Sequence, residues 1–432
     1  MANGTTPRKT TPTGMPAMVG MSLMALVAPL LQAQQRPTAR PTAPATAPAT
    51  AIAPPTATYW LYVGAESADR IYRVRFGPGG AVVEKTIGIG ELAAEMEGPH
   101  GLQISPDGKW LYMTTGHGTP DGKLWKYDLG PDTLVTRGIS LGKFPASLDV
   151  TPDGLYSFSA NFNLHGEMVP SSISVVYTPT MTEVAQVETC TMPHGSRIEP
   201  GGTMQYSGCM MDDQLVEIDT RSFAVTRRFS LAKGKEGPIT GAMAAGGHDL
   251  HAMHTTGARP DSAKSAAPAM AQQMDASQGH GVSMSASCSP TWAQPSVEGR
   301  VVYVACNKAD EIIEVDRTTW SITRRIATGR GPYNLAVTPD GKHMVATLKQ
   351  SAGVEIYDLA TGRSVAKLPT STTVAHGVVI SPDSRYAFVS SEGVGAAPGK
   401  VDVYDIRART RVATVDIGQQ ASGITFWKMD GK

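Results

Sequence analysis

The sequence predicts an all-β fold, a seven-bladed β-propeller whose closing blade combines strands from both ends of the chain. Three observations lead to this prediction. A Pro-Asp-Gly turn recurs at a nearly constant spacing, apolar and polar residues alternate around each copy, and the strands left over at the two ends complement each other.

The recurring turn sets the length of the repeat. It is clearest in the segment GPHGLQISPDG at 98–108, and variants follow at 144–154, 192–202, 289–296, 331–341 and 375–384. The turn prolines lie 46, 48, 95, 44 and 43 residues apart, in the order Pro106, Pro152, Pro200, Pro295, Pro339 and Pro382. Only the middle step is anomalous, which predicts an insertion after the third repeat.

Each repeat contains four short alternating runs. One run precedes the turn and a second follows it, as at 110–113; a third ends in Asp, as at 215–219, and a fourth comes after that Asp, as at 224–229. Alternation bounded by Pro, Gly and Asp is typical of antiparallel strands joined by tight turns. Four such strands in roughly 45 residues indicate one propeller blade.

The strands at the two ends of the chain complete the ring. Six blades have inner strands that start near His100, Ala146, His194, Thr291, Tyr333 and His376. A further inner strand at 421–427 has no partners after it, whereas three outer strands at 59–63, 70–74 and 81–87 have no inner strand before them. We expect these segments to form a composite seventh blade that closes the ring and protects its edges.

The motifs resemble the YVTN family of seven-bladed β-propellers, which are YncE-like repeat proteins. The Pro-Asp-Gly turn, the Tyr-Val strand and the Ile-x-Val-x-Asp-x-x-Thr strand carry the resemblance, which covers residues 58–430. The resemblance implies the fold but no single activity, because one scaffold of this kind supports several functions.

The N-terminus has the composition of a secretory signal. Arg8 and Lys9 precede an apolar run from Met15 to Leu31, and Ala33 is a small residue suited to signal peptidase. The alternative is an uncleaved anchor, although proline and glycine interrupt the run and a bilayer span usually needs ~20 apolar residues. We predict a signal peptide at 1–33 and a periplasmic or extracellular location.

Two further segments fall outside the repeat. Residues 34–57 are almost only Pro, Ala and Thr, which predicts an extended linker before a propeller domain at 58–432. The insertion, at 235–287, lies between blades 3 and 4, on the connection from an outer strand to the next inner strand. Such connections lie on the face where the inner strands begin, here called the top face, so we expect the insertion near the mouth of the central channel.

The numbers of positive and negative residues indicate which classes of partner to expect. The chain has 38 Lys and Arg against 38 Asp and Glu, so no net field attracts a polyanion such as nucleic acid. We expect a protein or small-molecule partner at the top face.

The repeat alignment places one residue per blade at the top of each inner strand. Three of these residues are His100, His194 and His376, and a fourth is Tyr333. Three imidazoles on a narrow axis can converge on an ion or an anionic ligand. The alternative is structural: Pro-His-Gly is then a turn at the start of the strand, and its imidazole bonds a neighbouring carbonyl.

The same alignment pairs the cysteines. Cys190 and Cys288 precede inner strands, and Cys209 and Cys306 end the second strands of the same blades. Each pair should meet at the open end of a hairpin, and an exported protein folds in an oxidising compartment, so we predict disulfides 190–209 and 288–306. A thiolate and imidazole metal site is the alternative, because Cys190 lies close to His194.

The insertion is rich in methionine and histidine, notably at His248, His251, Met253 and His254. Thioethers and imidazoles suit copper in oxidising compartments, so copper is the first metal to consider. Incidental composition of a linker is the alternative.

The sequence lacks the common catalytic signatures: Cys-x-x-Cys-His, His-Glu-x-x-His, the Walker loop and Gly-x-Ser-x-Gly. The first hypothesis is therefore a non-enzymatic binding scaffold. The alternative, suggested by similar propellers, is a periplasmic enzyme of lactonase-like or haem d1/copper redox type that uses the top-face histidines. Its acidic partners would come from Glu97, Asp212, Asp213 and Glu392.

Overall fold

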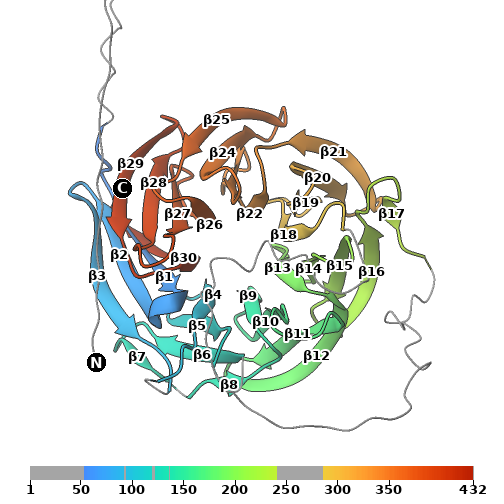
Figure 1. Cartoon of the computed structure of the whole chain (residues 1–432), viewed down its shortest axis with the longest axis horizontal. Coiled ribbons are helices and arrows are strands. Elements are labelled where there is room, and N and C mark those ends of the chain that lie inside the picture. Colours follow the sequence, from blue (N-terminus) through green and yellow to red (C-terminus); the bar gives the residue numbers. More distant parts are fainter. Residues whose placement is uncertain (1–52, 92–93, 119–121, 136, 241–285, 432) are drawn as a thin grey trace, which may run out of the picture. The chain divides into compact units, whose positions relative to one another are not determined.

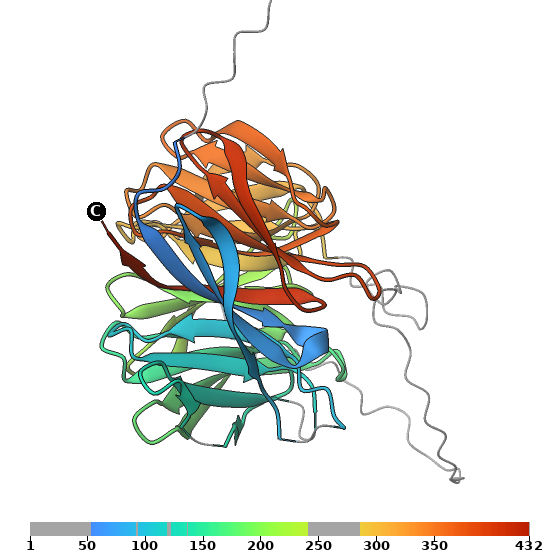
Figure 2. The same ribbon diagram turned by 90° about the vertical axis from the view of Figure 1, so that its left-hand side faces the viewer.

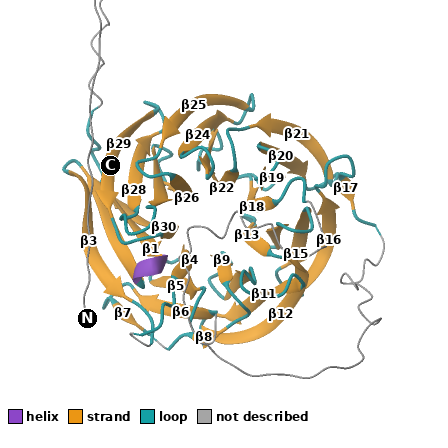
Figure 3. Ribbon diagram, viewed as in Figure 1, coloured by secondary structure: helices purple, strands orange, loops and turns teal. Residues whose placement is uncertain are grey.

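The computed structural model describes residues 53–91, 94–118, 122–135, 137–240 and 286–431. Within these residues the chain is almost entirely β-structure, and its one helix is the short 3-10 turn η1 (Glu66–Ala68). Figures 1 and 3 show the strands grouped into blades around a central axis. The all-β propeller predicted from the repeats is confirmed.

The blades follow one another along the chain. Blade 1 contains β4 (Pro99–Ile104), β5 (Trp110–Thr115), β6 (Lys123–Asp128) and the short β7 (Thr133–Leu134) and β8 (Ile139–Ser140). Blade 2 contains β9 (Pro145–Val150), β10 (Tyr156–Asn161), β11 (Pro170–Tyr177) and β12 (Thr182–Thr191). Blade 3 contains β13 (Pro193–Ile198), β14 (Met204–Cys209), β15 (Gln214–Asp219), β16 (Ala224–Ser230) and a short fifth strand, β17 (Gly237–Pro238).

The remaining blades have four strands each. Blade 4 contains β18 (Pro290–Pro295), β19 (Val301–Cys306), β20 (Glu311–Asp316) and β21 (Ser321–Ala327). Blade 5 contains β22 (Pro332–Val337), β23 (His343–Leu348), β24 (Gly353–Asp358) and β25 (Arg363–Pro369). Blade 6 contains β26 (Val374–Ile380), β27 (Tyr386–Glu392), β28 (Lys400–Asp405) and β29 (Thr410–Asp416).

The last blade is composite. Its strand order is β3 (Gly80–Gly88), β2 (Arg70–Gly77), β1 (Thr58–Ala65) and β30 (Ala421–Asp430), so the final strand of the chain pairs with the first (Figure 2). Side-chain hydrogen bonds connect this blade to the blades on both sides of it. The Tyr59 hydroxyl donates to Asp383 of blade 6 at 2.8 Å, and Trp427 Nε1 donates to the Gly108 carbonyl of blade 1 at 3.0 Å.

The Pro-Asp-Gly motif recurs because its side chains build the turn. In blade 1 the Ser105 hydroxyl donates to Asp107 Oδ1 at 2.5 Å, and the N–H of Gly108 donates to the Ser105 carbonyl at 2.8 Å. Gly108 has φ of 71°, a left-handed conformation that glycine adopts without strain. In blade 3 the carboxylate of Glu199 does the same work, accepting the N–H groups of Gly201 and Thr203.

Glycines let the inner strands approach the axis closely. Blades 3 and 4 touch through a parallel pairing of Gly195 with Trp292, which joins them into one nine-stranded sheet. A Cβ atom at Gly195 would lie 2.2 Å from the Trp292 side chain, and one at Gly423 would lie 1.9 Å from the His100 carbonyl oxygen. The glycines of the His-Gly pairs therefore have a packing role.

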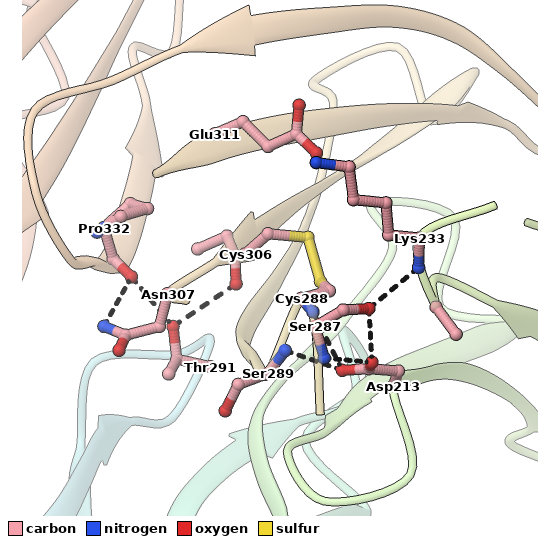
Figure 4. Close-up of a disulfide and its surroundings, with 12 residues drawn as sticks. Asp213, Lys233, Ser287, Cys288, Ser289, Thr291, Cys306, Asn307, Glu311 and Pro332 are labelled. Carbon is pink, nitrogen blue, oxygen red and sulfur yellow. Dashed lines mark hydrogen bonds between the residues drawn. A yellow bond between two sulfur atoms is a disulfide. The ribbon is translucent and has the colours of Figure 1, made fainter. Parts of the chain in front are cut away.

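The structure contains disulfides Cys190–Cys209 and Cys288–Cys306, the two pairs that the alignment predicted. Cys190 is consequently not available as a thiolate metal ligand. Beside the second disulfide, Asp213 accepts the N–H groups of residues 287–289 at 2.5 to 3.1 Å (Figure 4). This carboxylate fixes the start of blade 4 to blade 3.

Candidate binding site at the channel mouth

Four aromatic side chains meet on the axis at the tops of the inner strands. We call His100, His194, Tyr333 and His376 the four-ring cluster. Going around the axis, neighbouring ring centres lie 6.3, 5.2, 4.9 and 5.4 Å apart. Blades 1, 3, 5 and 6 supply these rings, and they meet because the equivalent residues of the other blades are small: Ala146, Thr291 and Ser422. The structure thus brings the candidate residues together, and their role as ligands stays a prediction.

Backbone carbonyls fix the tautomer of two histidines. Nδ1 of His100 lies 2.6 Å from the Ala146 carbonyl oxygen, and Nδ1 of His194 lies 2.9 Å from that of Thr291, the equivalent residue of the next blade in each case. A carbonyl only accepts, so each Nδ1 carries the proton and each Nε2 is an acceptor. These two imidazoles therefore bond neighbouring carbonyls, as the structural interpretation of the Pro-His-Gly motif predicts, and they also converge on the axis.

Tyr333 links two of the imidazoles. Its hydroxyl lies 3.0 Å from Nε2 of His194 and 3.4 Å from Nε2 of His376. His376 differs from the other two histidines, because the Ser422 carbonyl lies beside its Nδ1 but makes no well-formed hydrogen bond with it. Its Nε2 also lies 3.9 Å from Glu392 Oε1.

Burial keeps the imidazoles of His194 and His376 neutral. It is the largest cause that lowers the pKa of His194 to about 3, with the neighbouring His100 as the next cause. Burial, followed by the positive charge of Lys349, lowers the pKa of His376 well below its ordinary value. At neutral pH these two histidines therefore present uncharged acceptors.

A second set of residues, here called the second level, lies next to the four-ring cluster. Each of them ends the second strand of its blade or directly follows it. The charged members are Glu66, Lys349 and Glu392. Lys349 Nζ lies 3.3 Å from Glu392 Oε1 and 4.3 Å from the centre of the Tyr333 ring. Glu66 Oε1 lies 3.1 Å from Nε2 of His117. Of these three residues only Glu392 was predicted from the sequence, although all three lie at equivalent positions of their blades.

The charged groups of the second level hold one another in their ionised forms. Burial opposes the charge on Glu66, but His100 and His117 outweigh it, so the pKa of this carboxyl is lowered. Burial likewise opposes the charge on Lys349, but Tyr333 and Glu392 outweigh it, so the pKa of this amine is raised. Blades 5 to 7 thus present fixed charges at the mouth.

The opposite side of the mouth is apolar. Phe162 and Met210 occupy the second-level positions of blades 2 and 3, and they pack with Phe144 and Met192 in one hydrophobic cluster. The mouth is therefore polarised, with charged side chains over blades 5 to 7 and apolar ones over blades 2 and 3.

The other acidic candidates have structural partners. Asp212 accepts the N–H of Thr191 at 2.7 Å, and Asp213 holds residues 287–289 as described above. Glu97 accepts the N–H of Glu91 at 2.6 Å, while its second carboxylate oxygen has no partner. Of the four predicted carboxylates, Glu392 is the one whose charge contacts the four-ring cluster.

Comparisons with known proteins agree with the architecture. The sequence model of the YNCE-like beta-propeller family matches residues 150–413, which is more than half of the chain. The chain belongs to this family. The YNCE-like propeller is also similar to two solved structures. One is a hydrazine synthase of Kuenenia stuttgartiensis, with 16% identity, a TM-score of 0.55, and coverage of 80% of this chain and 92% of that chain.

The second structure is a functionally unknown protein from Desulfotomaculum acetoxidans, with 13% identity, a TM-score of 0.59, and coverage of 85% of this chain and 98% of that chain. None of the curated proteins compared with this YNCE-like propeller matches it. At such low identity the likeness to the two structures shows the fold alone.

The described residues of this YNCE-like propeller do not include the predicted copper ligands. In that part, no group of three or more His, Cys, Asp or Glu side chains is arranged to hold a metal ion. His248, His251, Met253 and His254 lie outside the described residues, as does the predicted signal peptide. No helix in the described ranges is long and apolar enough to cross a bilayer.

Replacing His194 by glutamine should make the YNCE-like propeller less sensitive to acid. The unfolded chain protonates this imidazole near pH 6.5, whereas the folded protein keeps it neutral down to a pKa of about 3. Between these values the unfolded state binds more protons, so stability falls as the pH drops below 6.5, by up to ~1.4 kcal/mol per pH unit for one such group. Urea unfolding between about pH 7 and about pH 5 should show a smaller loss in the variant.

The matched control is His343→Gln. His343 is the first residue of β23, whereas Lys349 follows the last residue of that strand. The control should retain the wild-type slope of stability against pH. Equal slopes in the His194 variant and the wild type would contradict the neutral state inferred for the cluster.

Proposed function

We propose that this protein is an exported β-propeller that acts as a binding scaffold, with its ligand at the mouth of the central channel. The convergence of the four-ring cluster carries the proposal. Nε2 of His194 accepts only the hydrogen bond that Tyr333 offers, and Nε2 of His100 has no hydrogen bond to any described residue. Such acceptors, surrounded by charged groups in a buried setting, are typical of functional sites.

The chemistry of the mouth favours a ligand with a positively charged group and an apolar part. His194 and His376 are neutral acceptors, and the carboxylates of Glu66 and Glu392 lie nearby. These groups suit a positively charged part of a ligand, and Phe162 and Met210 offer apolar contact. An organic ammonium with an aromatic ring meets both requirements. A copper ion meets only the first, and the described residues offer it no group of three His, Cys, Asp or Glu ligands.

Export is supported by the cysteines and by the N-terminal composition. Both disulfides require an oxidising compartment to persist. Protein isolated from its native host should begin near Gln34, as N-terminal sequencing can establish. A sequence that began at Met1 or Ala2 would indicate an anchored form instead.

Titration calorimetry tests the proposed site with two probes, copper and benzylammonium. Glu392→Gln removes one carboxylate with little change in shape, and we expect it to weaken binding of either probe about tenfold or more, the usual effect of losing a charged contact. Glu311→Gln, on the outer part of blade 4 where Glu311 pairs with Arg325, is the matched control and should bind like the wild type.

A second variant separates the mouth from the insertion. Replacing residues 241–285 by a short Gly-Ser linker keeps β17 and the bonds from Asp213. If this variant loses copper while Glu392→Gln keeps it, copper belongs to the insertion. If neither variant changes the binding of either probe, the proposal for the mouth is wrong.

An enzymatic role is the second candidate, and one contact favours it. The Tyr333 hydroxyl bonded to His194, beside the Lys349 ammonium, is an acid–base group of the kind that a lactonase-like reaction requires. The cavity beneath the cluster, with a volume of about 30 Å³, is too small for a haem. If the purified protein does not hydrolyse lactones, the binding scaffold is the better supported of the two functions.

A further inference from the structure

The central channel contains a small cavity on the inner side of the four-ring cluster. Its volume is about 30 Å³, and the three histidines of the cluster line it together with Arg197, Trp292 and Asn334. One water occupies ~10–15 Å³ of such a space, so there is room for about two waters or for a ligand of similar size.

Several residues that line this cavity depart from the repeat. In four blades the residue after the axis position is a glycine, where a Cβ atom would lie only 1.9 to 2.8 Å from another atom; these are Gly101, Gly195, Gly377 and Gly423. The other three blades have Ser147, Trp292 and Asn334 at the same position, and all three side chains line the cavity. The repeat alone does not require a tryptophan or an asparagine there.

Two of these side chains are buried without partners among the residues that the structure describes. Trp292 is 5% exposed, and its indole N–H donates to none of these residues. Asn334 is 6% exposed, and its Oδ1 accepts no hydrogen bond from them. A buried polar group without a partner costs ~1–3 kcal/mol, so a bound species that satisfies both groups would stabilise the fold.

Arg197 adds a permanent positive charge. Its Nη1 donates to the carbonyl oxygens of Ser196 and Leu148, at 2.9 and 3.3 Å, whereas Nε and Nη2 have no partner among the described residues. The guanidinium lies 4.5 Å from the centre of the Trp292 ring. A cation and an indole that both have unused donors therefore stack on each other, and both residues line the cavity.

The nearest counter-charge is already occupied. Asp149 accepts the N–H of Val150 and that of Ile198, both at 2.9 Å. Burial raises the pKa of this carboxyl, although Arg197 lowers it. Asp149 does not line the cavity, whereas Arg197 does.

We propose that this cavity binds a small monovalent anion of one to three heavy atoms, such as a halide or nitrite. The guanidinium supplies the charge, and the indole N–H supplies a fixed donor. The Asn334 carboxamide can turn its NH₂ group inward, because neither end of it has a partner in the described structure. A volume of about 30 Å³ favours such small ions over sulfate and phosphate. This site lies beneath the rings, so the three histidines separate it from the ligand proposed at the mouth.

Bromide is the probe. Crystals grown in sodium bromide should show an anomalous peak within hydrogen-bonding distance of Trp292 Nε1 and the Asn334 amide. In solution, bromide should raise the melting temperature more than sodium gluconate does at the same ionic strength, because an ion that binds only the folded state stabilises it.

Asn334→Leu tests the donor set while keeping the shape of the side chain. We expect it to weaken bromide binding about tenfold or more, as the loss of one hydrogen bond to a charged partner does. Asn307→Leu, at the top of blade 4 and outside the cavity, is the matched control and should bind bromide like the wild type. Asn334→Ser provides the same test if the leucine variant does not fold.

Two results would overturn the proposal. One is a cavity that holds only water in bromide-grown crystals. The other is an Asn334 variant that binds bromide as tightly as the wild type.

Discussion

Deleting residues 421–432 should yield a protein that melts at a far lower temperature than the full chain. The deletion removes β30, which pairs with β1 along its length and contributes Ala421 and Ile424 to a buried core shared with blades 6 and 7. It also removes the Trp427 bond to blade 1. We expect a loss of ~5 kcal/mol or more, comparable with the whole stability of many domains.

Thermal unfolding followed by circular dichroism measures this effect. A shorter deletion of residues 431–432, which lie beyond β30, is the control and should leave the melting temperature unchanged. Size-exclusion chromatography should show association of the longer deletion, because β1 becomes an unpaired edge. An unchanged melting temperature would show that the ring does not depend on its composite blade.

Removal of a disulfide should have the next largest effect. The double substitution of Cys288 and Cys306 by serine opens a loop with a sequence separation of 18 residues, which costs ~3 kcal/mol in the loop-entropy model. The pair at 190–209 has a separation of 19 and should cost about the same. The two disulfides lie in different hydrophobic clusters, so the two losses should add.

Urea unfolding of the two double variants and of the quadruple variant measures these losses. Dithiothreitol should lower the stability of the wild type toward that of the quadruple variant and leave the quadruple variant itself unchanged. Peptide mapping without reductant should recover both disulfides in the wild type. Four free thiols in that map would contradict the pairing.

Most of the fold was predictable because each blade repeats the same local rules. The Ser105 and Asp107 contacts that build one turn recur at Thr151 and Asp153, so one well-marked copy identifies the weaker ones. The pairing of β1 with β30 followed from counting strands that had no partners. Burial of alternate residues and tight turns are local properties, and a sequence shows them directly.

The site was only partly predictable. The alignment fixes the blade and the level of each histidine, but not how far its side chain reaches toward the axis. The contact of His194 with Tyr333 depends on the small Thr291 between them, which is a property of three blades together. Lys349 and Glu66 were missed because only the first residue of each inner strand was compared, whereas their signal lies at the ends of the second strands.

The insertion illustrates the limit of such an alignment. Outside the repeat there is no register, so the spacing of histidines and methionines predicts composition but not position. The described residues at its margins show the difference, because β17 lies within the predicted insertion and yet extends blade 3. Trp292 and Asn334 show a second limit, since an alignment identifies them as departures from glycine without revealing the cavity that they line.

The composite blade also sets the order in which the molecule can be completed during synthesis. Of the described strands, β1 to β3 are made first and their inner partner β30 is made last. Until then β1 has a free edge, and the pairing that finally covers it joins segments at opposite ends of the chain, a slow kind of contact. Every incomplete chain therefore carries an open ring with an exposed strand, and a chaperone or protease can distinguish it from the finished protein.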